Sequence, residues 1–183
     1  MTKLPLVLRE LHRSETGLAR DLLALADRHR ADADVFHVAR DIAVWSQIHV
    51  RRLANAGAEH GVRLDPEPRW TQPRAVVRAV ARGLRHRRAP GLLLLADLRH
   101  VHRVAAGVSL DWELLAQAAQ GMKQRSLLEL AQDCHPQTLR QMRWANAQLK
   151  QLSAVSITFE MPTISESLEA VRGYKSRRER SPG

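Results

Sequence analysis

The hydrophobic positions near the N-terminus repeat with the period of an α-helix. From about residue 4 to residue 30, leucines recur at alternating steps of three and four, the spacing that places side chains on one helix face. These leucines are Leu8, Leu11, Leu18, Leu22 and Leu25. One step of the pattern falls on Glu15. The pattern therefore predicts a first helix with a carboxylate on its apolar face.

A second helix, again with one ionisable residue on its apolar face, is expected after a short break. The run RHRADADV interrupts the stripe, and Asp34 can cap a helix that continues from Val35 to about Ala58. Its apolar stripe consists of Val38, Ile42, Trp45, Leu53 and Ala56. His49 lies in that stripe, so each of the first two helices has one ionisable group on its predicted inner face.

A long segment without this regularity separates the first two helices from the next two. It covers about residues 58–90, begins with turn-forming residues and continues as a short amphipathic helix with a strong basic bias. The helical period then returns over about 91–120 and about 123–155, the latter with Pro136 as an expected kink. Residues 159–183 form a C-terminal extension, disordered beyond about 172.

Composition agrees with one all-α domain. A chain of 183 residues with 44% hydrophobic and only 4% aromatic residues can build a helical core without disulfides. The single cysteine, Cys134, excludes an internal disulfide and a cysteine-based zinc cluster, which favours the cytoplasm. The N-terminal apolar run is too short for a signal peptide, and the leucine-rich run near residue 95 is interrupted by Asp97 and Arg99. We therefore expect no integral membrane association.

The lengths of the connections predict a topology. A long middle link lets the second and third helices run in the same direction, whereas an up-down-up-down bundle needs only a short loop there. Over about residues 5–155 this pattern resembles the ferritin-like superfamily of bacterioferritin-type and rubrerythrin-type bundles. The resemblance implies a four-helix bundle over residues 1–158 with one long crossover. It also implies a core that binds two metal ions, often iron, through two Glu and two Glu-x-x-His motifs.

Few residues match the metal ligands of that family. Glu15 matches the first-helix carboxylate and His49 the histidine of the second-helix motif, but Ser46 stands where that motif has its glutamate. No Glu-x-x-His occurs in the chain. The remaining candidate ligands on the third and fourth helices are His102, Asp111 and His135. Such a set could hold one iron or zinc ion but not a carboxylate-bridged pair, so loss of the two-metal centre is the expectation.

The same residues also have a purely structural interpretation. A buried carboxylate needs a partner, so Glu15 could pair with an arginine from another helix. His49 on an apolar face would then be a hydrogen-bonded core histidine. Cys134 and His135 are neighbours in a predicted helix, where their side chains point about 100° apart, which argues against a thiolate nucleophile.

Basic residues dominate the charge of the chain, with a net charge of +10 and a pI of about 11.2. The long connection contains the arginines Arg74, Arg78, Arg82, Arg85, Arg87 and Arg88. No acid lies between Arg69 and Asp97, so this cationic stripe repels itself and would gain from an anionic partner. Nucleic acid, an acidic protein surface and an anionic membrane surface are the alternatives. With only Trp70 nearby for stacking, contact with nucleic acid would involve phosphates rather than bases.

Three functions follow from these patterns. The leading one is a cytoplasmic, oligomeric binding or assembly protein without a resident cofactor. The alternatives are an iron- or zinc-binding oxidase or iron-handling protein that uses Glu15 and His49, and a nucleic-acid-associated protein that uses the Arg74 to Arg88 stripe. The sequence leaves open whether the chain is an enzyme.

Overall fold

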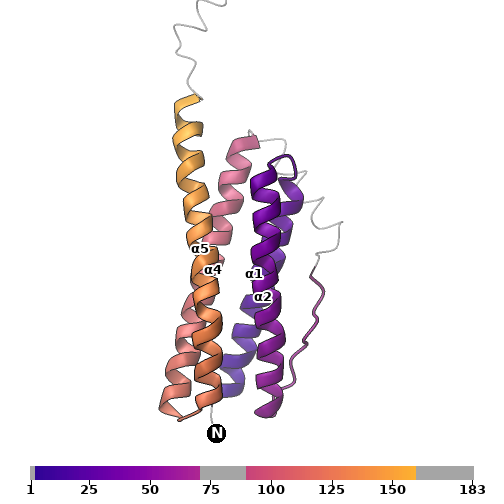
Figure 1. Ribbon diagram of the computed structural model, residues 1–183, viewed down its shortest axis with the longest axis vertical. Helices are drawn as coiled ribbons and strands as arrows, with labels where there is room; N and C mark the ends of the chain where they lie inside the picture. The colour runs from indigo at the N-terminus through magenta and orange to yellow at the C-terminus, as the bar shows by residue number, and fades with distance from the viewer. Residues whose placement is uncertain (1–2, 71–89, 160–183) are drawn as a thin grey trace, which may run out of the picture.

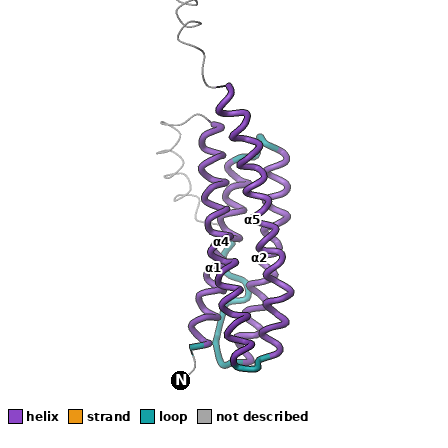
Figure 2. Tube along the Cα trace, turned by 90° about the vertical axis from the view of Figure 1, so that its left-hand side faces the viewer, coloured by secondary structure: helices purple, strands orange, loops and turns teal. Residues whose placement is uncertain are grey.

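Four long α-helices make up the computed structural model (Figure 1), which describes residues 3–70 and 90–159. They are α1 (Leu4–Arg28), α2 (Ala33–Glu59), α4 (Pro90–Gly121) and α5 (Arg125–Phe159). The described residues contain no β-strand (Figure 2), and none of their helices is long and apolar enough to cross a membrane. The predicted all-α four-helix bundle, with a long connection between its second and third helices, is confirmed.

Short links join the helices within each half of the bundle. Between α1 and α2, Asp32 is the N-cap, and its side chain accepts a hydrogen bond of 3.0 Å from the Val35 amide. The prediction that Asp34 is the cap was wrong, because Val35 is the third residue of the helix and only a carboxylate three positions earlier reaches its free N–H group. Between α4 and α5 the chain turns at Lys123, which has a positive φ of 56°.

Contacts between the helices fix their directions. Along α1, Arg28 contacts Asp97 while Glu15 contacts Trp112, so α1 and α4 are antiparallel. α2 and α5 are also antiparallel, because Arg52 contacts Asp133 while the Ile42 carbonyl contacts Gln141. Since the short links make α1 antiparallel to α2 and α4 antiparallel to α5, α2 and α4 run in the same direction.

The first part of the long connection, residues 60–70, runs back along the first two helices. It turns at Gly61, whose φ of +70° favours glycine. The Asp65 carbonyl then lies 2.8 Å from His12 Nε2, and the Arg69 carbonyl accepts a 2.8 Å hydrogen bond from Arg20. Because successive contacts move from His12 to Arg20, this segment carries the chain along α1 toward the end of the bundle where α4 begins.

Two predicted features lie outside the described residues. The short basic helix of the connection, with the stripe Arg74 to Arg88, falls within residues 71–89. The C-terminal extension falls within residues 160–183.

The core follows the predicted stripes closely in α1 and less closely in α2. All five predicted leucines of α1 have no exposed surface. In α2, however, Val38, Trp45 and Ala56 are only half-buried. The buried face of α2 instead includes Ala39 and Ala43, whose small side chains allow the neighbouring helices to pack closely.

Candidate functional site

The centre of the bundle contains a buried carboxylate that receives hydrogen bonds from all three other helices. Glu15 of α1 is 0% exposed, and burial of an unpaired carboxylate would be strongly unfavourable. Its Oε1 atom lies 2.8 Å from His49 Nδ1 of α2. The same oxygen accepts hydrogen bonds from Trp112 Nε1 of α4 at 2.6 Å and from Thr138 Oγ1 of α5 at 3.1 Å. Glu15 therefore ties the four helices together at one point.

His49 completes this arrangement as a cation. Its Nδ1 faces Glu15 Oε1 and its Nε2 faces Gln137 Oε1, each at 2.8 Å. Both neighbouring atoms are acceptors, so both ring nitrogens donate and the imidazole carries two protons. The Trp112 ring lies edge-on to it, with 5.6 Å between ring centroids.

The pKa values of the two groups agree with this ion pair. Burial acts to lower the pKa of His49, but the negative charge of Glu15, together with hydrogen bonding to Cys134 and Glu15, outweighs burial and raises that pKa to about 10. Burial acts to raise the pKa of Glu15, yet the charge and hydrogen bond of His49 leave it lowered. At neutral pH both groups are ionised.

A second set of buried polar groups lies about one helical turn away from this pair, before His49 on α2 and after Gln137 on α5. The Nε2 group of Gln141 donates hydrogen bonds to the Ile42 carbonyl at 2.8 Å and to Ser46 Oγ at 3.0 Å. Ser46 occupies the position at which the ferritin-like motif has its glutamate, so an amide from α5 occupies the space beside the serine. Glu15 Oε2 and Gln141 Oε1 have no hydrogen-bond partner among the described residues.

The structure brings together two of the five predicted metal ligands. Glu15 and His49 are in contact, whereas His102 Nδ1 lies 3.1 Å from the Met142 carbonyl. His135 Nε2 lies 2.8 Å from Ser109 Oγ and 3.9 Å from a carboxylate oxygen of Glu113. Asp111 is half-buried on α4. Within residues 3–70 and 90–159, no group of three or more His, Cys, Asp or Glu side chains is placed to hold a metal ion.

Several residues of the site were not singled out by the sequence patterns. The partner of Glu15 is His49 rather than an arginine. The sequence patterns did not indicate that Trp112, Gln137 or Gln141 takes part. Thr138 and Gln141 are polar residues in the apolar stripe of α5, the same signal that identified Glu15 and His49. The predicted anion-binding arginines, Arg74 to Arg88, lie outside the described residues.

In comparisons with known proteins, no family model, no curated protein and no solved structure matches this chain. The geometry of the buried cluster and the charges on the helix surfaces are therefore the basis for the function proposed below.

Proposed function

We propose that this chain is a ferritin-like bundle that works without a metal centre, as a cytoplasmic, homo-oligomeric binding or assembly protein. The helix order supports the ferritin-like part of the proposal. Its connections are short, long and short, and α2 and α4 run in the same direction, as in bundles with a single crossover.

The observation that carries the metal-free core is that each ring nitrogen of His49 faces an acceptor oxygen, Glu15 Oε1 or Gln137 Oε1. A histidine binds a metal through the lone pair of a neutral ring, and a ring with two donating nitrogens has no such lone pair. With a pKa of about 10, His49 keeps both protons at neutral pH. Glu15 Oε1 is already engaged by three donors. The residues present therefore do not fit a di-iron or zinc centre, and the positive charge of the imidazolium takes the place of a metal ion.

Burial supports a role in binding rather than in catalysis. Glu15 and His49 are 0% and 1% exposed, so a substrate in solution does not reach them. The surface of α4, in contrast, carries exposed apolar side chains that a partner could contact. Leu110 and Leu114 lie one turn apart on α4 and are 61% and 62% exposed, and burial of such leucines against a second copy would favour self-association. Sedimentation of the purified protein tests this part of the proposal.

Metal analysis tests the central claim. We expect tag-free protein to contain far less than one equivalent of iron or zinc, and a chelator to leave the melting temperature unchanged. Addition of either ion should likewise leave the melting temperature unchanged, because a ligand stabilises only the state that it binds. One tightly bound ion per chain that is lost in Glu15→Ala, but kept in the control Glu113→Ala, would instead establish the metal-dependent alternative.

A second candidate function is phosphate-driven association with nucleic acid through the Arg74 to Arg88 stripe. The sequence supports it, since 27 consecutive residues from Trp70 to Ala96 contain no acid. The described surface of α4 and α5 provides an independent observation in the same direction.

A further inference from the structure

Two neighbouring segments of α4 and α5 carry basic side chains and contain no acidic residue, and Asp97, which precedes the first segment, faces Arg28 and His29 of α1. Residues 98–109 of α4 and 134–153 of α5 contain neither Asp nor Glu. The exposed cations in these two segments are Arg99, Arg103, Arg140, Arg143 and Lys150. We call these five residues the α4–α5 basic surface. None of them forms an ion pair with another described residue.

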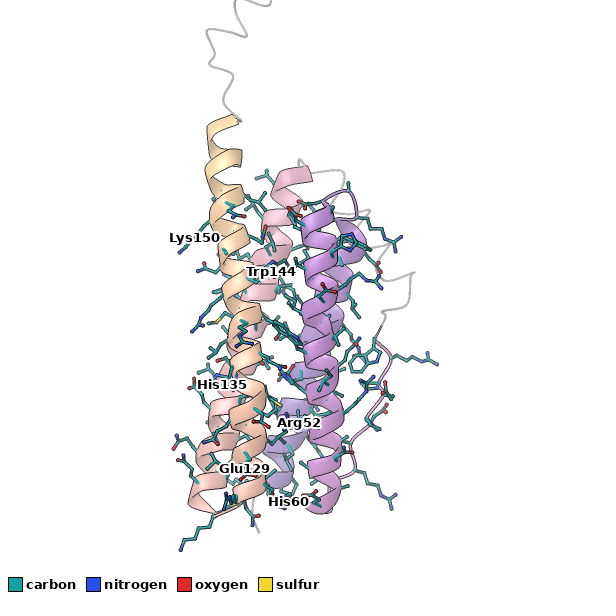
Figure 3. All side chains as sticks on the ribbon, viewed as in Figure 1. Arg52, His60, Glu129, His135, Trp144 and Lys150 are labelled. Carbon is teal, nitrogen blue, oxygen red and sulfur yellow. The ribbon has the colours of Figure 1, made fainter. Side chains whose placement is uncertain are left out.

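The helix register places these charges at the same level of the bundle. His102 contacts the Met142 carbonyl, so their sequence neighbours Arg103 and Arg143 lie at similar heights on adjacent antiparallel helices. Arg99 and Lys150 both lie nearer to the end of the bundle at which Arg28 and Asp97 are in contact. Figure 3 shows Lys150 on the side of α5 that faces away from α1 and α2. Packed helices lie about 8–10 Å apart, so the two rows of charge form one continuous surface.

Elsewhere on the described surface, the exposed residues Arg9, Arg40, Arg63 and Arg69 also lack an acidic partner, whereas other exposed arginines form ion pairs with acids. Four such pairs are Arg13 with Glu10, Arg30 with Asp27, Arg51 with Glu67, and Arg125 with Glu129. The cations of the α4–α5 basic surface differ from the other unpaired arginines because they lie on two adjacent helix segments that contain no acid.

The chemistry of the surface fits phosphate groups. Four of its five cations are arginines, whose guanidinium groups donate paired hydrogen bonds to phosphate oxygens. From Arg140 to Lys150 the row extends ten residues, or about 15 Å at 1.5 Å per residue, which covers several phosphates of an extended polyanion.

Two features favour a nucleic-acid duplex among polyanionic partners. Trp144 is the only aromatic residue in the two segments and is half-buried, so the surface offers no stacking platform for a single strand. Among the described residues, the most exposed leucines, Leu110 and Leu114, lie outside the two acid-free segments, whereas a helix that binds a lipid surface needs apolar side chains beside its cations. We propose that the α4–α5 basic surface binds the sugar-phosphate backbone of a nucleic-acid duplex without reading its sequence. This inference names a partner for the binding role proposed above.

A salt series with a labelled DNA duplex of mixed sequence tests the inference on the full chain. For the wild type, the logarithm of the binding constant should fall linearly with the logarithm of salt concentration, with a slope of about −0.9 per neutralised phosphate. The variant Arg99→Ala/Arg103→Ala/Arg143→Ala/Lys150→Ala should bind at least about tenfold more weakly near 0.1 M salt, with a slope shallower by about 3 to 4. All four side chains are exposed, and circular dichroism checks that the variant folds.

The matched control removes the same charge from positions that already have acidic partners. Arg13→Ala/Arg30→Ala/Arg51→Ala/Arg125→Ala should bind the duplex within about threefold of the wild type, since these guanidinium groups are paired. Equal losses in the two variants would show that only net charge matters and would overturn the inference. So would a wild type that binds phosphatidylserine vesicles but no duplex, or binding abolished by alanines at Arg74 to Arg88 and untouched by the α4–α5 variant. The metal content decides the metal-free core separately, so either proposal can fail alone.

Discussion

Two ionic clusters of similar chemistry lie at different depths in the bundle. In the centre, Glu15 and His49 have side chains that are 0% and 1% exposed. Near one end of the α1–α4 interface, Asp97 Oδ2 accepts hydrogen bonds from Arg28 Nε and His29 Nε2, each at 2.8 Å. There the side chains of Arg28 and Asp97 are 25% and 15% exposed.

Depth determines what each cluster contributes to stability. At Asp97, burial acts to raise the pKa, but the hydrogen bonds of His29 and Arg28 leave it lowered, and water reaches the cluster if a partner is removed. At Glu15 the two charged side chains are almost completely buried, so each charge depends on the other. A buried pair is weak evidence of net stabilisation, yet loss of one partner leaves an uncompensated charge. The comparison therefore predicts different penalties for similar substitutions.

The largest expected effect is the removal of one member of the central pair. Glu15→Ala should lower the free energy of unfolding by about 3–5 kcal/mol, because it leaves His49 and the Trp112 indole N–H group without their acceptor. His49→Ala should have a penalty of similar size, because it leaves the carboxylate without its counter-charge. Urea unfolding followed by circular dichroism measures both.

The double variant Glu15→Ala/His49→Ala decides whether this penalty comes from coupling. It should be less destabilised than the sum of the single variants by roughly 1–3 kcal/mol, since no unpaired charge remains. Additive losses would show that the two residues contribute through packing alone, and the contrast with the Asp97 cluster would lose its physical basis.

The pH dependence of stability should reveal the same pair. Because the folded-state pKa of His49 is raised from 6.5 to about 10, its contribution is fully present below about pH 6.5 and is lost as the pH rises through 10. The pKa of Glu15 is lowered, so its contribution is present above about pH 4.5 and is lost as the pH falls through its folded-state value. Between pH 6.5 and 10 the free energy of unfolding should fall by an amount on the order of a few kcal/mol.

A comparison of the wild type with a variant that lacks His49 separates the contribution of this residue from those of other titrating groups. The stability difference between the wild type and His49→Gln should shrink over pH 6.5 to 10, because the unfolded wild type loses its imidazole proton near pH 6.5 and folding must take that proton up again, which becomes less favourable as the pH rises. A difference that stays constant over this range would show that His49 is neutral in the folded protein, and it would reopen the metal-binding interpretation.

The smallest effects are expected toward the surface. Asp97→Ala should lower the free energy of unfolding by about 1 kcal/mol, because Arg28 and His29 can be solvated once their partner is lost. Arg125→Ala removes an ion pair whose arginine is 90% exposed, and we expect no measurable change. Thermal unfolding of these two variants and of Glu15→Ala ranks the three losses of stability. Equal losses for Asp97→Ala and Glu15→Ala would mean that burial does not separate the two clusters.

Sequence patterns predicted most of the fold but only part of the central site. The leucine period placed α1 and its buried face correctly, because that period is a property of a few neighbouring turns. It was less accurate for α2, where Trp45 lies at the edge of the core rather than inside it. Which flank of an apolar stripe becomes buried depends on where the neighbouring helices lie, and the sequence of one helix does not contain that information.

By itself, the sequence determined that four amphipathic helices form, that a long connection follows the second, and that Glu15 and His49 face inward. These properties depend on local spacing and on the burial of apolar side chains. Only the tertiary structure decided that the two residues contact each other across 34 positions, and that Trp112 and Thr138, 97 and 123 residues from Glu15, donate to the same oxygen. It also decided that Gln137 faces His49 as an acceptor, so that the ring is protonated on both nitrogens. Hydrogen bonding and charge in a core depend on which atoms lie within about 3 Å of each other, and this is fixed only when the helices pack.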